Sequence, residues 1–481
     1  MISRLLAYTL LGLLLFVGFQ VWSKRHAALP PPLTPPAAAP PAPASAASPN
    51  TQLSVTLSDP AAQPIVRQSG TPLTIPVKVS GSPHAAALNE INALIQQGKD
   101  ADAEAKLKAL PPDALNDPAV RASTSTLWNN LGVMRVKASG AAAGVPAYKS
   151  ALAINPYNAI AHHNLVYAYW ELKDPALTPE LLEESIQLNP DNPLPHLALA
   201  ELLLNKDDLS GARTHLVQAK DHIAEAPNLQ AYLGRLIVQV EQTQKAEQKF
   251  LARESSHFLV KFDGDADQAV WNRVLEILED AYREVGQQLG HFPAKPTLVV
   301  LHTRETFQGA AGGPAWSDGL YDPVMGRIKV PTQGALTDKA WLTRVLRHEY
   351  VHALLRDRMG GRGAIPQWLN EGLAMQLAGD PPPDIPELIR GQVTLVNLSY
   401  LEGSWMVLTP KQAIVAYLEG NSATKYFIDR FGMEKMREVL GQLATGQTFP
   451  DAFKDRLFIT YEDFQHRWID DLNEKIKAGR L

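Results

Sequence analysis

Hydrophobic and polar positions change their pattern several times along the chain, and each change suggests a boundary. Residues 5–22 are almost continuously apolar, and residues 29–49 consist mainly of proline, alanine and serine. From Ala85 onward apolar side chains recur at helical spacing, whereas after Ser255 short apolar runs typical of strands come first and helices follow. The pattern therefore predicts a leading apolar segment, a spacer, an all-α domain and an α+β domain.

Residues 1–25 are predicted to be a membrane anchor or signal anchor. The apolar run is long enough to reach across a bilayer and is longer than the usual core of a cleaved signal peptide. No convincing small-residue cleavage site follows it directly, although a cleaved signal peptide is the alternative. We expect a soluble body in the periplasm or another extracytoplasmic compartment, while basic residues on both flanks leave the orientation open.

Residues 26–84 are predicted to be a proline- and alanine-rich linker followed by an irregular segment. A stretch dominated by proline favours extended polyproline II and buries no core, so it holds the folded body away from the membrane. Near its end apolar residues alternate weakly at Leu73, Ile75 and Val77, which is compatible with short strands or with irregular structure.

Residues 85–250 carry an internal repeat. Asn155-Pro156 returns as Asn189-Pro190, 34 residues later, and Leu131 and Leu165 keep the same period. The signature positions of the first unit are Trp128, Leu131, Gly132, Tyr148, Ala151 and Pro156. The segment resembles a tetratricopeptide array, which implies an all-α solenoid with a groove for a protein partner or a peptide. The alternative is a spacer that packs on the following domain.

The composition excludes several kinds of site. The 481 residues include no cysteine, so disulfides, thiolate nucleophiles and cysteine-bound metals are absent, and any metal must bind nitrogen and oxygen atoms. The 45 basic and 50 acidic side chains give a formal net charge of −5. Such a mild charge offers no electrostatic reason to expect a nucleic-acid partner.

The segment His348-Glu349-Tyr350-Val351-His352 lies on a helix predicted over residues 337–358. Histidines four residues apart share one helical face, so both imidazoles reach one metal ion at about 2 Å. Glu349, beside the first histidine, is placed to take a proton from a water molecule as a general base. A catalytic zinc site needs one more protein ligand and an open position for water.

Glu371 is the predicted third ligand. Glycines and Pro366 separate its helix from the first one, so the chain reverses and the two helices pack together. Glu371 lies in an otherwise apolar helix, and a buried carboxylate is costly unless it is paired or binds a metal. Two histidines and one glutamate form a thermolysin-type set. His348, His352 and Glu371 are therefore the ligands expected to bind Zn²⁺.

These residues resemble the gluzincin signature of zinc metallopeptidases, in which a helix bearing His-Glu-x-x-His precedes a helix bearing Asn-Glu-x-x-Ala. Strands predicted at residues 258–262 and 297–302, with a hairpin over residues 320–330, resemble the peptidase MA-like family. For residues 255–481 the resemblance implies a zincin-like (thermolysin-type) α+β fold and hydrolysis of peptide bonds in a protein or peptide substrate. An endopeptidase is favoured, because no Gly-x-Met-Glu-Asn segment typical of aminopeptidases precedes the motif.

The resemblance also implies roles around the metal. In such enzymes an edge strand aligns the substrate backbone, and it corresponds here to residues 327–330 or 319–321. Tyr417 resembles the tyrosine whose hydroxyl stabilises the oxyanion, with an ordinary packing tyrosine as the alternative. The alternative for the whole chain is a non-catalytic, zinc-containing tetratricopeptide scaffold for an envelope protein complex.

Overall fold

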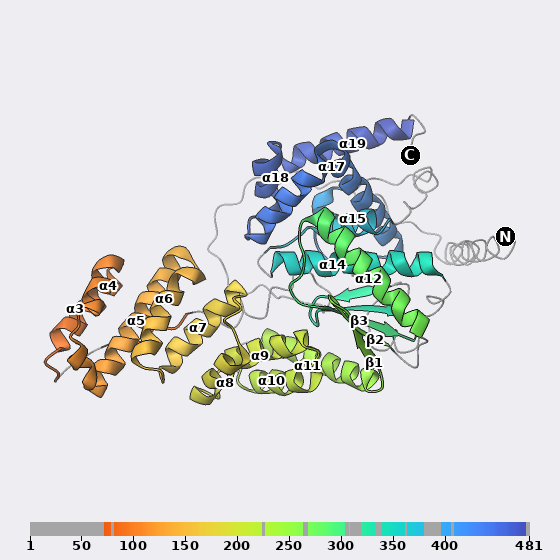
Figure 1. Ribbon diagram of the computed structural model, residues 1–481. Coiled ribbons are helices and arrows are strands. Elements are labelled where there is room, and N and C mark those ends of the chain that lie inside the picture. The colour runs from red at the N-terminus through yellow and green to blue at the C-terminus, as the bar shows by residue number, and fades with distance from the viewer. Residues whose placement is uncertain are drawn as a thin grey trace. The chain divides into compact units, whose positions relative to one another are not determined.

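Figure 1 shows the computed structural model of the chain, whose described residues all belong to one compact unit, Ser54–Leu481. They are residues 72–77, 81–223, 227–262, 268–303, 307, 319–331, 338–360, 363–379, 396–405 and 408–477. The predicted anchor, residues 1–25, and most of the linker lie outside these ranges. Among the described helices, none is long and apolar enough to cross a membrane.

The N-terminal half consists of helices in which each packs against its neighbours in the chain. The helices are α3 (Ala85–Gln96), α4 (Asp100–Lys108), η1 (Pro112–Asn116), α5 (Pro118–Ser139), α6 (Ala141–Ile154), α7 (Ala159–Leu172), α8 (Pro179–Leu188), α9 (Pro193–Asn205), α10 (Leu209–Asp221) and α11 (Pro227–Glu247). Close packing follows from a missing side chain, because a Cβ on Gly132 of α5 would lie 2.5 Å from the Tyr148 ring of α6. The tetratricopeptide assignment itself stays a prediction.

The repeated Asn-Pro step is held by a histidine at the same interval. The Nε2 atom of His162 lies 2.9 Å from the carbonyl oxygen of Pro156, and Nε2 of His196 lies 3.3 Å from that of Pro190. Each histidine thus bonds a carbonyl that follows the end of one helix from the first turns of the next. His162 belongs to the packing of the repeat, as its position in the period indicated.

The second half begins with a mixed sheet in the order β1-β2-β3-β5-β4. Its strands are β1 (Leu251–Glu254), β2 (Phe258–Phe262), β3 (Thr297–His302), β4 (Leu320–Asp322) and β5 (Arg327–Pro331). The strands β2, β3 and β5 run parallel, whereas β1 and β4 are antiparallel to their neighbours. The strands predicted at residues 258–262 and 297–302 are therefore confirmed.

The prediction that residues 327–330 form an edge strand is wrong. β5 pairs with β3 on one side and with β4 on the other, so β4 is the edge nearest the motif. Arg327 and Lys329 made this strand look like a charged edge. Both side chains are instead completely buried, because acidic groups cover them.

One face of the sheet is apolar and the other is charged. The helices α12 (Gln268–Leu289) and α14 (Lys339–Met359) lie together on one side of it (Figure 1), and they share a core with Val260, Val299 and Ile328. These three residues are partners across neighbouring strands and point to the same face. The helices therefore cover the apolar face of the sheet.

Ion pairs on the charged face join the sheet to the helical half. Arg327 donates from Nη1 to Glu247 Oε1 at the end of α11 (2.9 Å) and from Nη2 to Asp207 Oδ1 between α9 and α10 (3.0 Å). Lys329 donates to Asp322 Oδ2 on β4 at 3.1 Å. Buried charges are tolerated only when paired, so these contacts specify how the helices attach to the sheet.

The remaining helices complete the core behind the apolar face of the sheet. They are α15 (Gln367–Ala378), η2 (Leu398–Leu401), α17 (Pro410–Ala444), α18 (Phe449–Leu457) and α19 (Tyr461–Lys477). The long helix α17 is kinked at Gly432, whose φ of 82° is unfavourable for other residues. Aromatic side chains such as Phe427, Phe453 and Phe464 pack between these helices.

Replacing Arg327 by methionine should weaken the attachment of helices to sheet. Arg327→Met leaves two buried carboxylates with Lys261 as their remaining partner, so the free energy of unfolding should fall by roughly 3 kcal/mol, measured by urea denaturation. The matched control is Arg213→Met, which breaks a pair whose side chains are 44% and 43% exposed and should cost below about 1 kcal/mol. Equal losses in the two variants would contradict the structural role of the buried pairs.

Candidate metal centre

The helix α14 carries both histidines of the motif. It begins after Asp338, whose carboxylate accepts a hydrogen bond from the Trp341 N–H (3.1 Å), and it ends at Gly360 in the left-handed conformation. The rings of His348 and His352 lie one turn apart, with centroids separated by 4.9 Å and planes inclined at 77°. Local helical geometry therefore presents two imidazoles on one side of α14.

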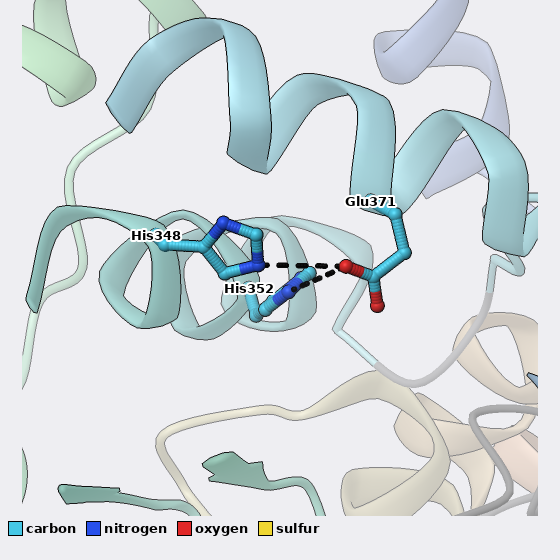
Figure 2. A group of neighbouring side chains, drawn as sticks. All are labelled: His348, His352 and Glu371. Carbon is cyan, nitrogen blue, oxygen red and sulfur yellow. Dashed lines mark ion pairs between the residues drawn. The ribbon is translucent and has the colours of Figure 1, made fainter. Parts of the chain in front are cut away.

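Glu371 reaches the two histidines from the neighbouring helix α15. Figure 2 shows its carboxylate pointing to both rings, with Oε2 at 3.4 Å from His348 Nε2 and 3.5 Å from His352 Nε2. Among the described residues, these three are the group whose ligand atoms all lie within 4.8 Å of one another. Glu371 Oε2 is buried and makes no hydrogen bond. Two imidazole nitrogens around an unbonded carboxylate oxygen fit the donor set of a catalytic zinc ion.

Gln367 orients the carboxylate of Glu371. Its Nε2 donates a hydrogen bond of 2.8 Å to Glu371 Oε1, which leaves Oε2 directed at the histidines. Gln367 lies one helical turn before Glu371, and such outer partners commonly fix the orientation of metal ligands. The spacing of four residues was visible in the sequence, but it could be recognised only once Glu371 was considered a ligand.

The charges of the three side chains depend on one another. Burial raises the pKa of Glu371, but the positive charges of His352 and His348 outweigh burial and hold this pKa below its ordinary value. Burial lowers the pKa of His352, but the carboxylate of Glu371 outweighs it and the pKa rises. Glu371 is therefore ionised, as a metal ligand has to be.

Glu349 lies against the end of the edge strand β4. Its side chain is buried, and burial raises the pKa of its carboxyl group, whereas the backbone N–H of Tyr321 donates a hydrogen bond to it. A Cβ on Gly319 would lie 3.0 Å from both Cγ and Oε1 of Glu349. The chain before β4 thus approaches Glu349 closely because residue 319 has no side chain. Residues 319–321, one of the two predicted edges, are the ones that the fold places here.

Tyr417 lies on α17 and packs edge-to-face on Trp405, with ring centroids 5.0 Å apart. The ring is partly buried against the main core. This contact accounts for the position of the ring and does not test a role at a carbonyl oxygen, so that role stays a prediction.

Two glycines let α15 pack directly on α17. A Cβ on Gly372 would lie 2.0 Å from Thr424 Oγ1 and 2.5 Å from the carbonyl oxygen of Gly420. A Cβ on Gly420 would in turn lie 2.7 Å from the carbonyl oxygen of Trp368. Because Gly372 directly follows Glu371, this close crossing fixes the height and rotation of the third ligand.

With this geometry in place, comparison with known proteins identifies the region around the site. Residues 279–473 match the Peptidase MA superfamily. The match extends from α12 to α19 and includes the three candidate ligands, Glu349 and Tyr417, while residues 85–250 lie outside it. No curated protein matches the chain. A Peptidase MA region indicates a peptidase, and members of this superfamily are typically metal-dependent, in agreement with the cluster of histidines and glutamate.

Substituting Gly372 should disturb the metal centre through the crossing of α15 and α17. Gly372→Ala forces the helices apart, so we expect a loss of stability of roughly 1–3 kcal/mol and less bound zinc per chain, measured by metal analysis of the purified protein. Gly441→Ala on the same helix α17 is the control, because its Cβ would meet only the Arg358 side chain, at 3.8 Å. Unchanged zinc content and stability in Gly372→Ala would show that the crossing does not position Glu371.

Proposed function

We propose that this chain is a zinc-dependent endopeptidase. The observation that carries the proposal is the convergence of Nε2 of His348, Nε2 of His352 and Oε2 of Glu371, with Glu349 on the same helix as the two histidines. The match of residues 279–473 to the Peptidase MA superfamily supports the same reaction class. The rival, a scaffold that retains a zinc site without catalysis, has the same ligands and differs in what Glu349 does.

Zinc held by His348, His352 and Glu371 would supply a Lewis acid for the scissile carbonyl group and an acidified water molecule. Glu349 accepts the proton of the attacking water and passes it to the nitrogen of the leaving amine. Tyr417 donates a hydrogen bond to the carbonyl oxygen as negative charge develops on it. The substrate backbone lies along β4, because this edge strand begins beside Glu349 and has a side without a described strand.

The remaining parts of the chain have supporting roles in this proposal. The helical repeats of residues 85–250 dock a protein substrate or a protein partner. Residues 1–25 attach the chain to a membrane, and the linker of residues 26–84 holds the catalytic region in a periplasmic or other extracytoplasmic space. Of the possible roles for the zinc domain, hydrolysis is favoured because Glu349 is buried beside the edge strand where a substrate would lie.

Substitution of the general base tests the proposal. Glu349→Gln keeps the size of the side chain and removes the proton acceptor, so zinc content should stay unchanged while kcat falls at least about 100-fold. Hydrolysis is measured by mass spectrometry on a diverse peptide pool, with Glu276→Gln on the exposed face of α12 as the control. Removal of zinc by a chelator should abolish the activity, and added zinc should restore it. If wild type and Glu349→Gln produce identical peptide profiles, the chain is not an enzyme of this class.

Gly319 allows a second test that leaves the ligands untouched. The new Cβ of Gly319→Ala would press on Glu349, so we expect kcat to fall about tenfold or more while zinc content and thermal stability remain close to those of the wild type. Gly403→Ala is the control, because no atom lies within 4 Å of its added Cβ. A normal kcat in Gly319→Ala would mean that β4 does not constrain the general base.

A further inference from the structure

A short segment before the first helix, residues 72–77, lies on the helical repeats and is held by asparagine side chains. Leu73 donates its N–H to Asn164 Oδ1 and accepts from Asn164 Nδ2, both at 2.8 Å. Ile75 makes the same pair of bonds with Asn130, at 3.2 Å to Oδ1 and 2.7 Å from Nδ2. Both backbone groups of every second residue therefore face the helices, as they do along one edge of an extended strand.

Each of these asparagines replaces the peptide group of a partner strand. A side-chain amide carries one acceptor and one N–H₂ donor, so it can bond the N–H and the C=O of one residue at the same time. Two further asparagines extend the set, with Asn129 Nδ2 at 3.1 Å from the Leu73 carbonyl and Asn92 Nδ2 at 3.3 Å from the Val77 carbonyl. The helices thus bind the segment as a sheet edge binds an added strand.

The asparagines form a connected and buried network. Asn164 Nδ2 donates to Asn129 Oδ1 at 2.7 Å, and Asn129 Nδ2 lies 3.3 Å from Asn130 Oδ1. All three side chains are buried. Buried amides are costly unless their hydrogen bonds are made, and the segment supplies the acceptors and donors that the network lacks by itself. Such a network indicates a site built for a peptide backbone.

The spacing of the asparagines follows the repeat. Asn130 and Asn164 are 34 residues apart and occupy equivalent positions on α5 and α7, the first helices of successive units. Each unit thereby contributes one asparagine for every second residue of the bound segment. The period that generates the helical stack also generates the periodic recognition of an extended chain.

The site recognises backbone and leaves the side chains of the segment in solvent. Leu73 and Ile75 remain 40% and 37% exposed although their backbone groups are bonded. Pro72 and Pro76 occupy positions whose missing N–H the site does not need, and proline favours the extended conformation. The requirement on a ligand is therefore an extended chain with free N–H groups at two alternate positions.

We propose that the asparagine-lined face of α5 and α7 is a binding site for an extended segment of another protein, and that residues 72–77 occupy it as a built-in competitor. Residues 78–84 join the segment to α3, so its effective concentration at the site is of millimolar order. A segment from another chain binds by displacing it. The partner has the chemistry of the competitor, an extended and uncharged stretch with proline outside the two recognised positions.

Binding of a labelled peptide measures the competition. The probe is a fluorescent peptide with the sequence of residues 71–78, added to the full-length chain carrying Glu349→Gln so that the probe cannot be cleaved. In the double variant Leu73→Pro and Ile75→Pro the competitor loses both N–H donors, and the affinity for the probe should rise at least about tenfold. Thr74→Pro, which alters the unbonded position between them, is the matched control and should bind as weakly as the parent chain.

Probes methylated on the backbone nitrogen test the recognition itself, without any change in the protein. Methylation at the position of Leu73 or Ile75 should abolish binding to the double variant, whereas methylation at the position of Thr74 should leave it within about threefold. Equal binding of the parent chain and the double variant would overturn the competitor. Equal binding of all methylated probes would overturn backbone recognition. Neither result depends on peptidase activity.

Discussion

The close crossing of α15 and α17 is the constraint on which the metal centre depends. Gly372 and Gly420 remove the two Cβ atoms that would separate these helices, and Thr424 fills the space beside them. The start of α15 is also anchored, because the buried Trp368 donates a hydrogen bond of 2.9 Å to the Tyr461 hydroxyl of α19. With α15 fixed from both sides, Glu371 has one position relative to α14, and its carboxylate meets the histidines there.

The second constraint is electrostatic and extends from the helical repeats to the general base. Asp322 at the end of β4 accepts hydrogen bonds from Lys329 on β5 and from Gln239 on α11 (2.8 Å). The same strand begins beside Gly319, which lies against Glu349. The turn between β4 and β5 adds an apolar contact, because Met325 belongs to the core of the repeats. The edge strand next to the general base is therefore supported by the repeats through a few residues.

Buried polar groups decide the specific contacts in both halves of the chain. Arg327 and Lys329 would be poor choices for the inside of a sheet unless carboxylates met them, and Asn129 and Asn164 would be poor choices for a helix interface unless a peptide backbone met them. Apolar packing could tolerate several arrangements of these elements, whereas an unmet charge or amide would cost a large share of the stability of the fold. The partners of these groups thus select one arrangement.

Local features were readable in the sequence because their cause lies within a few residues. The common face of His348 and His352 follows from helical periodicity, the strands at residues 258–262 and 297–302 from short apolar runs, and the helical stack from a period of 34 residues. Glu371 was recognised as a candidate because a carboxylate in an apolar helix needs a partner. The roles of these residues in catalysis remain predictions.

The order of strands, the crossing of helices and the occupant of the asparagine site were decided only by the tertiary structure. The charged residues of β5 indicated an edge strand, but β4 pairs with it and the helical repeats neutralise it. Leu73 and Ile75 gave only a weak alternation, because their side chains stay exposed and their backbone groups make the contact. The sequence by itself determined which elements form and which side chains can bind a metal. Contacts between segments far apart in the chain decided where those elements meet, since they depend on shape and on partners that no local pattern contains.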